Sequence, residues 1–193
     1  MGKELEVKVL NINVNEMEKK LISVGAKLVK KERQENIIFD TRNIFSKQGI
    51  EGYMRIRETN NLLHEGKSYA LTLKKRKYSK NLRKNIEIET QIENKDTLIE
   101  IFHELGIDIV HRGHKLRTSY AYENLLFELD IWDKETYPEP YMEIEMEKES
   151  DLEKAIKLRD LNREDITNKS LGILRNKYFL KDSVESKGDT NKW

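Results

Sequence analysis

Apolar and polar residues alternate along most of this chain, and no other feature of the sequence constrains its fold as strongly. At the start, Leu5 and Val7 alternate with Glu4, Glu6 and Lys8. The same alternation returns at residues 54–57, 69–74, 85–91, 115–119, 127–131 and 142–147. A period of two is typical of a strand with one buried and one polar face. With the stretch 26–39, these segments predict about eight strands in an antiparallel order.

Helices are predicted between these strands. Asn15 and Glu18 have the spacing of a capping box and, with Gly25 as a stop, predict a helix over residues 15–26. Further helices are predicted over residues 95–105 and 150–161, and a fourth over residues 170–180. The polar segment 181–193 is expected to be a frayed tail. The chain is therefore predicted to form one α+β domain over residues 1–180, followed by this tail.

Composition excludes several classes of protein. Because the chain has no cysteine, it has no disulfide, no thiolate nucleophile and no Cys-ligated metal site. Charged residues make up 37% of the chain, yet the net charge is only +1, so no overall field attracts nucleic acid or an anionic membrane. No apolar run approaches the roughly 18 residues of a membrane span, and the first residues lack a signal peptide's apolar core. A cytoplasmic location is expected.

Two motifs resemble catalytic signatures and are rejected. Gly66-Lys67-Ser68 matches the end of a P-loop, but position 61 is Asn and a strand rather than a helix follows. The segment is interpreted as a hairpin loop. His111 and His114 lack a carboxylate at helical spacing, so they are interpreted as part of a solvated loop rather than a metal site.

The polar faces of the predicted strands are sorted by charge. Residues two apart on a strand point to the same side of the sheet. The acidic pairs at this spacing are Glu4/Glu6, Glu87/Glu89, Glu128/Asp130 and Glu143/Glu145, and the basic pairs are Arg55/Arg57 and Lys115/Arg117, joined by Lys8 and Lys74. A solvated sheet face normally mixes both signs with Thr, Ser and Gln, so this sorting needs an explanation.

Two arrangements explain these faces. In the first, they form the outer surface of a sandwich, where cross-strand ion pairs contribute about 0.2–1 kcal/mol each. In the second, amphipathic helices cover the apolar side of the sheet, and closing the sheet turns the charged side into a lumen. Neighbouring carboxylates repel unless a cation lies between them, so such a lumen suits a divalent cation with a polyphosphate. The pattern alone leaves both arrangements open.

The same residues carry a family resemblance. Glu4-Leu5-Glu6-Val7-Lys8 matches the ExExK signature of the CYTH superfamily, the triphosphate tunnel metalloenzymes that include class IV adenylate cyclases and thiamine triphosphatases. Further motifs that resemble those of the family follow in order: Ile38-Phe39-Asp40-Thr41, Arg55-Ile56-Arg57, Leu71-Thr72-Leu73-Lys74, Glu87-Ile88-Glu89, Lys115-Leu116-Arg117, Asp130 and Glu143-Ile144-Glu145. The chain departs from the family at Asn85, where Arg is frequent, although Arg83 lies on the same face. This leaves the contribution of the fifth strand open.

The resemblance implies a closed antiparallel β-barrel flanked by helices, whose lumen binds a triphosphate together with Mg²⁺ or Mn²⁺. It implies metal ligands at Glu4, Glu6, Glu143 and Glu145, with Asp130, Glu87 and Glu89 at a second ion. It implies phosphate-binding residues at Lys8, Arg55, Arg57, Lys74, Lys115 and Arg117, with Lys8, Arg57 and Lys115 as the catalytic candidates.

Three activities fit these residues. A triphosphatase acting on tripolyphosphate, ATP or thiamine triphosphate needs only the lumen and an attacking water, and it is the first choice. A class IV adenylate cyclase, which makes cyclic AMP and pyrophosphate from ATP, also needs a pocket for adenine and ribose, and the sequence offers no aromatic or amide cluster for it. The third reading is a non-catalytic binder of polyphosphate or a nucleotide. The expected partner is a small triphosphate rather than nucleic acid or a membrane, and a homodimer is left open.

Overall fold

The computed structural model of the protein describes residues 2–49, 51–77, 83–159 and 161–188. At residues 2–4, 76–77, 83–85, 158–159 and 181–188 it describes the backbone alone. The strands are β1 (Gly2–Val9), β2 (Lys27–Phe39), β3 (Gly52–Asn61), β4 (Lys67–Lys77), β5 (Arg83–Ile92), β6 (Ile109–Tyr122), β7 (Leu125–Trp132), β8 (Tyr141–Met146) and β9 (Ile166–Thr167). The helices are α1 (Val14–Ser23), α2 (Arg42–Lys47), α3 (Lys95–Glu104), α4 (Asp151–Arg159) and α5 (Leu171–Gly188), with a 3₁₀ turn at Arg163–Asp165.

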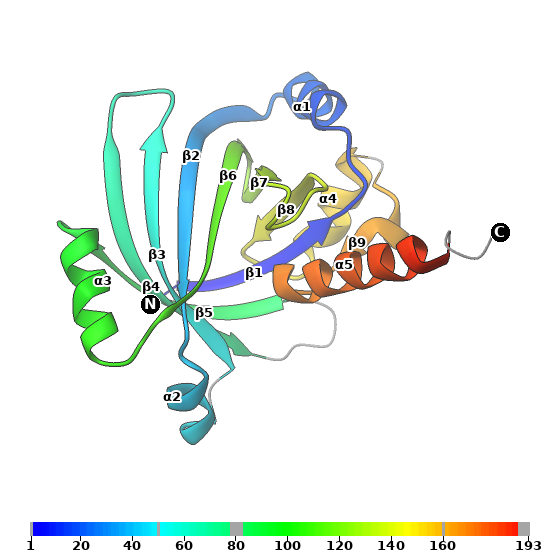
Figure 1. Ribbon diagram of the computed structural model, residues 1–193. Helices are drawn as coiled ribbons and strands as arrows, with labels where there is room; N and C mark the ends of the chain where they lie inside the picture. The colour runs from blue at the N-terminus through cyan, green and yellow to red at the C-terminus, as the bar shows by residue number, and fades with distance from the viewer. Residues whose placement is uncertain (1, 50, 78–82, 160, 189–193) are drawn as a thin grey trace.

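The nine described strands form one antiparallel sheet in the order β5-β4-β3-β2-β6-β7-β8-β1-β9. The sheet is strongly curled, and β1 also pairs with β5, with Gly2 opposite Glu87 and Glu6 opposite Arg83 (Figure 1). On its other side β1 pairs with β8, which places Glu6 opposite Glu145. The protein is thus an α+β fold with nine antiparallel strands and five helices in its described residues. The α+β class predicted from the alternation is confirmed.

Helices α1 and α4 cover the apolar face of β1, β7 and β8. This core contains Val7, Phe127 and Ile144 from the strands, all at most 1% exposed, together with Leu21 of α1 and Ala155 of α4. Because side chains alternate along a strand, burying this face against helices turns the intervening charged residues to the opposite side of the sheet. Because the helices cover the apolar face, the charged face lies on the inside of the curled sheet.

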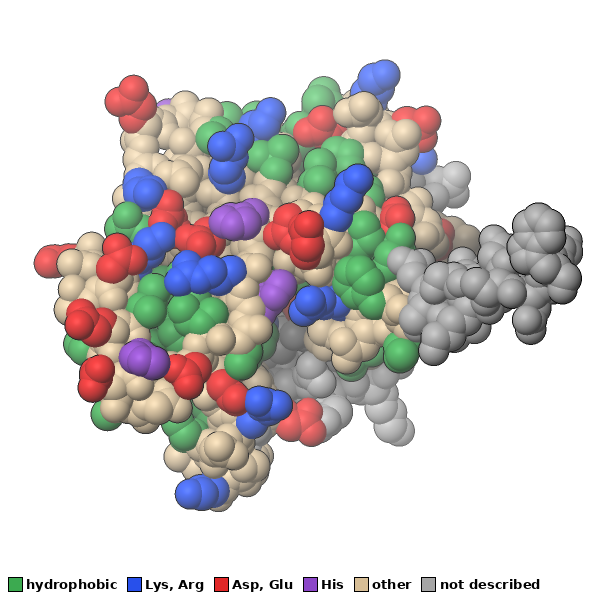
Figure 2. All heavy atoms as spheres, viewed as in Figure 1, with side chains coloured by type: hydrophobic (Ala, Val, Ile, Leu, Met, Phe, Trp, Pro, Cys, Tyr) green, Lys and Arg blue, Asp and Glu red, His purple; other side chains and the backbone are tan. Residues whose placement is uncertain are grey.

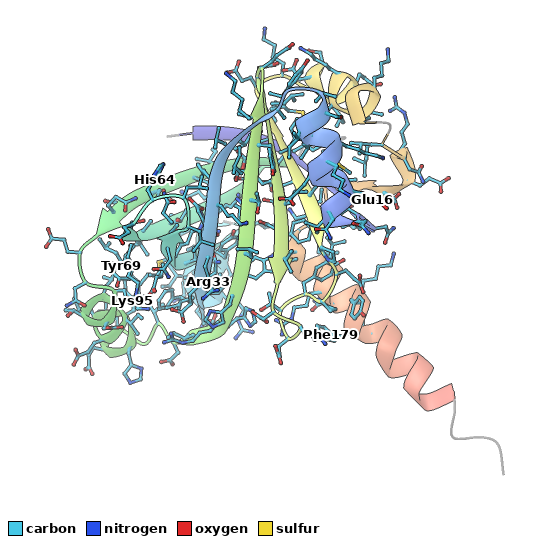
Figure 3. The ribbon with its side chains drawn as sticks, turned by 90° about the horizontal axis from the view of Figure 1, so that it is seen from above. Glu16, Arg33, His64, Tyr69, Lys95 and Phe179 are labelled. Atoms are coloured by element: carbon cyan, nitrogen blue, oxygen red, sulfur yellow. The ribbon has the colours of Figure 1, made fainter. Side chains whose placement is uncertain are left out.

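Helix α3 covers the neighbouring strands β2 and β3 in the same way. Ile37, Phe39 and Ile56 are buried beneath it, and the ring of Phe102 meets that of Phe39 edge to face at 5.0 Å. Lys95 at the start of α3 lies beside Tyr69 of β4 (Figure 3). Both halves of the sheet thus present their apolar side to helices.

Helix α5 packs on aromatic residues at one end of the curled sheet. Leu174 is buried with Tyr137 and Tyr141, and Leu171 and Tyr178 pack on the same cluster. From there the helix extends away from the strands, with Phe179 40% exposed (Figure 3). The first two turns of α5 therefore border the interior of the sheet.

The helix boundaries differ from those predicted. Helix α1 is capped by Asn13, whose side chain accepts from the backbone N–H of Glu16, so the predicted cap at Asn15 was wrong. Helix α2 was not predicted, because it is short and buries only Phe45. Helix α5 continues past Leu180 to Gly188, so the first part of the expected frayed tail is helical. Residues 189–193 lie outside the described part.

The surface seen in Figure 2 mixes acidic and basic side chains over the same face of the molecule. This agrees with the net charge of +1. None of the helices in the described residues combines the length and the apolarity that crossing a bilayer requires.

Candidate active site: a charged cavity inside the sheet

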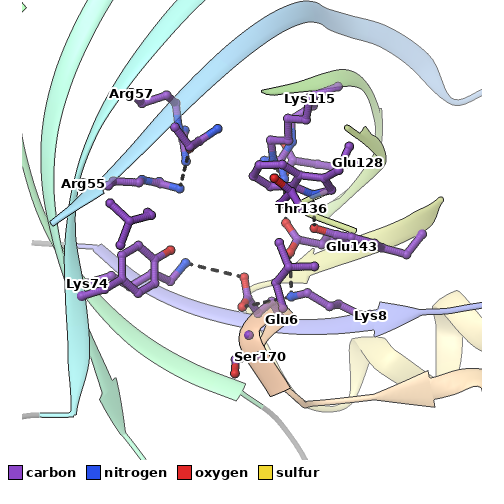
Figure 4. A pocket seen from close by; sticks show the side chains of 18 of the residues that line it. Glu6, Lys8, Arg55, Arg57, Lys74, Lys115, Glu128, Thr136, Glu143 and Ser170 are labelled. Carbon is purple, nitrogen blue, oxygen red and sulfur yellow. Dashed lines mark hydrogen bonds and ion pairs between the residues drawn. The ribbon is translucent and has the colours of Figure 1, made fainter. Parts of the chain in front are cut away.

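The polar face of the sheet encloses a cavity of about 530 Å³ (Figure 4). Eleven of the thirteen sequence-predicted site residues line it: Glu6, Lys8, Arg55, Arg57, Lys74, Glu87, Glu89, Lys115, Arg117, Glu143 and Glu145. They come from β1, β3, β4, β5, β6 and β8, and period-two alternation turns them to the same side. Bringing charged residues from so many strands into one enclosed space fits the lumen arrangement and not the outer face of a sandwich.

Three carboxylates form a cluster within this cavity. One oxygen from each of Glu6, Glu143 and Glu145 lies within 4.8 Å of the others. The pairing of β1 with β8 creates this proximity, since it places Glu6 opposite Glu145 and Lys8 opposite Glu143. Grouped carboxylate oxygens at this spacing are the donor type that Mg²⁺ and Mn²⁺ prefer.

The bases beside this cluster are paired with carboxylates. Lys8 Nζ lies 2.7 Å from Glu143 Oε1 and 3.8 Å from Glu6 Oε1. Lys74 Nζ lies 2.5 Å from Glu87 Oε1 and 3.8 Å from Glu6 Oε2. Both lysines are at most 8% exposed, so these contacts are largely removed from water.

Arg117 is the centre of the densest ion-pair network. Its Nε and Nη2 donate to the two carboxylate oxygens of Asp130 at 2.7 and 2.6 Å, and Nη2 also donates to Glu143 at 2.7 Å. Nη1 donates to Glu128. Burial alone would lower the pKa of Arg117, but Asp130 and Glu128 raise it well above its ordinary value. Burial would raise the pKa of Glu143, yet Lys8 and Arg117 hold it well below the usual range.

Lys115 shares Asp130 with Arg117. Its Nζ lies 2.8 Å from Asp130 Oδ2 and 5.1 Å from the centre of the Trp132 ring. Burial and the neighbouring Arg117 lower the pKa of Lys115 despite this carboxylate. We call the paired residues of β1, β6, β7 and β8 the carboxylate wall; its members are Glu6, Lys8, Lys115, Arg117, Glu128, Asp130, Glu143 and Glu145.

The opposite side of the cavity, on β2 and β3, is different. Arg55 Nη1 donates to the amide oxygen of Asn36 at 3.4 Å, and Asn36 lies opposite Arg57 in the strand register. Within the described residues neither arginine forms an ion pair with a carboxylate, and the buried Nε atoms of both have no hydrogen-bond partner. We call Asn36, Arg55 and Arg57 the arginine wall. Figure 4 shows Arg55 and Arg57 across the cavity from Lys115 and Glu143.

One end of the cavity is lined by residues that the sequence interpretation missed. Tyr53, Trp132 and Tyr141 line it together with Arg175 from the first turns of α5. Trp132 Nε1 donates to the hydroxyl of Tyr141 at 2.8 Å, and burial together with Asp130 raises the pKa of Tyr141 well above its ordinary value. The cavity therefore has an aromatic mouth, although no aromatic cluster was expected.

His111 also lines this mouth. It belongs to β6, so its interpretation as part of a solvated loop was wrong. A ring nitrogen of His111 lies 2.9 Å from the hydroxyl of Thr136, and burial followed by the charge of Arg175 lowers its pKa. The loop that carries Thr136 is held against β6 by Asp133, which accepts from the backbone N–H of His114.

Two of the thirteen predicted residues are not seen to line the cavity. The side chain of Glu4 lies outside the described part of the chain. Asp130 is fully buried behind the lining, with both oxygens bound to Arg117 and Lys115. Glu89 does line the cavity and accepts from the hydroxyl of Thr72 at 2.7 Å.

The missed residues follow the same alternation as the predicted ones. Tyr53 shares its strand face with Arg55 and Arg57, while Tyr141 shares its face with Glu143 and Glu145. Trp132 extends the face of Glu128 and Asp130 in the same way. Following each charged face one further step would have found the aromatic mouth.

Comparison with known proteins agrees with the motifs and the cavity. The CYTH domain model matches residues 2–170. The chain belongs to the CYTH family. A protein of Methanocaldococcus jannaschii named "Putative adenylate cyclase" is 32% identical over 130 residues, which cover 66% of this chain and 69% of the relative.

Solved structures share the fold of this CYTH domain. The PH1819 protein of Pyrococcus horikoshii has a TM-score of 0.70 at 26% identity, covering 90% of this chain and 99% of that one. The PH1012 protein of the same organism has a TM-score of 0.71 at 22% identity, covering 87% and 96%. A Hippeastrum protein, titled a putative adenylyl cyclase with a dominant triphosphatase activity, has a TM-score of 0.64 at 18% identity, covering 92% and 96%.

Proposed function

We propose that this CYTH protein is a metal-dependent triphosphatase that hydrolyses an inorganic or organic triphosphate held in the cavity. The observation that carries the proposal is that a carboxylate cluster and the six predicted basic side chains line the same cavity. A triphosphate with its metal needs both kinds of ligand, oxygen donors for the cation and guanidinium or ammonium donors for the phosphate oxygens. The pairing of β1 with β5 supports the further proposal that the sheet works as a closed tunnel.

The donor set fits Mg²⁺ or Mn²⁺. Glu6, Glu143 and Glu145 provide clustered carboxylate oxygens and the family is metal-dependent, so these residues are proposed as the ligands. A bound ion supplies neutralisation of phosphate charge and a more acidic water nucleophile. Glu4 remains a candidate ligand of the same ion, and Glu87 and Glu89 remain candidates for a second ion. Asp130 is better suited to positioning, because it is fully buried and does not line the cavity, and it holds Arg117 and Lys115 in place.

The basic residues are proposed to bind and orient the phosphates. Arg55, Arg57, Lys74 and Arg117 provide donors for phosphate oxygens from different strands, which fixes the chain of phosphoryl groups in one orientation. Lys8, Arg57 and Lys115 are proposed as the catalytic members, since charge that develops on the transferred phosphoryl group is stabilised by preorganised donors. Lys8 and Lys115 are buried, which keeps their interactions in an environment of low dielectric constant, where they are stronger than in water.

A class IV adenylate cyclase is the second candidate, and the aromatic mouth favours it. Tyr53, Trp132 and Tyr141 offer ring surface for an organic group next to the phosphate-binding residues. The name of the Methanocaldococcus relative points the same way. The triphosphatase remains first because hydrolysis requires only the cavity and water, and the fold carries a dominant triphosphatase activity in the Hippeastrum protein.

The test is to incubate the purified protein with tripolyphosphate, ATP or thiamine triphosphate in Mg²⁺ or Mn²⁺ and to separate the products. Release of orthophosphate supports the triphosphatase. Formation of cyclic AMP and pyrophosphate from ATP supports the adenylate cyclase instead. Tight binding with no turnover of any of the three compounds leaves the non-catalytic binder.

A further inference from the structure

The bases of the cavity differ in the group that holds them. On the carboxylate wall, Lys8, Lys115 and Arg117 each contact at least one carboxylate. Arg55 contacts instead the neutral amide of Asn36, and both side chains are buried, at 7% and 2% exposed. An amide oxygen accepts a hydrogen bond from a guanidinium but leaves its positive charge uncompensated.

Several buried polar atoms around this contact have no partner among the described residues. They are Asn36 Nδ2, Arg55 Nε and Arg57 Nε, with Gln34 Oε1 on the same face of β2. Leaving a buried donor unpaired costs about 1–3 kcal/mol, so a group of such donors on one wall indicates a ligand that accepts from them. Phosphoryl oxygens are acceptors and carry the opposite charge to the two arginines.

We propose that Asn36 determines the anion affinity of the arginine wall, because it holds Arg55 in place without neutralising it. The wall then binds one phosphoryl group of the substrate directly, with no metal required. A carboxylate at position 36 would form with Arg55 the kind of ion pair that Asp130 forms with Arg117, and would compete with the phosphoryl group. This inference rests on the proposed function, since it assigns one part of the same cavity.

The experiment measures tripolyphosphate binding by isothermal titration calorimetry in EDTA, in the wild type, Asn36→Asp and Asn36→Ala. Asn60→Asp is the matched control, because it makes the same change on β3, opposite Arg33 and away from the cavity lining. Asn36→Asp is expected to weaken binding by about tenfold, equivalent to about 1.4 kcal/mol. Asn36→Ala leaves the charge of Arg55 uncompensated and should weaken tripolyphosphate binding by about threefold or less. Asn60→Asp should leave the affinity unchanged.

Each outcome separates this inference from the proposed function. Equal affinity of Asn36→Asp and the wild type overturns the inference, as does binding by the wild type only when Mg²⁺ is added, and both leave the proposed function standing. No binding by the wild type with or without Mg²⁺ contradicts the proposed function itself. Circular dichroism checks folding. If Asn36→Asp does not fold, the test is Arg55→Ala, which should lose about tenfold or more in affinity for tripolyphosphate while Asn36→Ala does not. Equal losses of affinity in these two variants overturn the inference.

Discussion

The two walls of the cavity use the same types of basic residue in different electrostatic settings. On the carboxylate wall, Arg117 is bound by Asp130, Glu128 and Glu143. On the arginine wall, Arg55 is held by an amide, and Arg57 has no ion-pair partner among the described residues. A base whose charge is already compensated stabilises the fold, whereas an uncompensated buried base is available to a ligand at a cost to the fold. The walls should therefore respond differently to the same substitution.

Removal of the metal should have the largest effect, since it should abolish turnover while the arginine wall still binds phosphate. EDTA should reduce turnover to background, because hydrolysis then lacks the cation that would neutralise phosphate charge and make the attacking water more acidic. The arginine wall should still bind tripolyphosphate under the same conditions. Phosphate release is measured before and after chelation and again after Mg²⁺ or Mn²⁺ is restored. Full activity in EDTA contradicts the metal-dependent account.

Arg117→Ala should give the largest loss of stability. The change leaves buried Asp130 and Glu128 without their main partner, which typically costs about 3–5 kcal/mol. Urea unfolding followed by circular dichroism measures the effect, with Arg57→Ala as the matched control. Equal losses of stability in the two variants mean that the walls do not differ as described.

Arg57→Ala should affect turnover more than stability. Loss of one preorganised donor lowers the rate by roughly 10²–10³. Arg57 is half-buried and has no carboxylate partner among the described residues, so its removal should leave the melting temperature unchanged or raise it. Both quantities are measured on the same sample. A variant that is less stable but fully active indicates that Arg57 belongs to a structural ion pair and not to a phosphate site.

The smallest effect is expected outside the cavity, where Lys95 of α3 joins Glu35 and Glu58. Burial would raise the pKa of each glutamate, but the neighbouring basic groups lower it below the ordinary 4.5. The stabilisation is therefore present above pH 4.5 and is lost as the pH falls through the lowered values. Lys95 and Glu35 are only partly buried, and Glu58 keeps Lys67 as a second partner, so the contribution of Lys95 should amount to about 1 kcal/mol.

Lys95→Ala isolates this contribution. Its deficit in unfolding free energy relative to the wild type should shrink between pH 7 and pH 3, because the carboxylates lose their charge. Turnover should not change, since Lys95 does not line the cavity. A deficit that stays constant over this range excludes the ion pair as its source.

The strands and the residues of the charged cavity could be predicted because both follow from a period of two. The alternation of Arg55 and Arg57 with apolar residues identified their shared face, and the helices then determined that this face was the inner one. The aromatic mouth was missed because only charged positions were followed along each strand. Tyr141 lies on the same face as Glu143, so the signal was present in the sequence.

Which charged side chains pair with one another across the strands could not be predicted from residue type. Asp130 and Glu143 are both acidic residues on predicted strand faces, but only Glu143 lines the cavity, while Asp130 lies behind it under Arg117 and Lys115. The role of Asn36 could not be predicted for the same reason, since it depends on the contact of its amide with Arg55 on the neighbouring strand. Such pairings depend on strand register, and alternation within one strand does not fix register.

The proposed function requires the cavity to bind a triphosphate between the two walls. The most direct measurement is a crystal structure with Mn²⁺ and a non-hydrolysable triphosphate analogue, with the ion located by anomalous scattering. Mn²⁺ is expected at Glu6, Glu143 and Glu145, and phosphate oxygens are expected within hydrogen-bond distance of Arg55 and Arg57. An analogue bound outside the cavity, or inside it with no contact to either arginine, contradicts the proposed function.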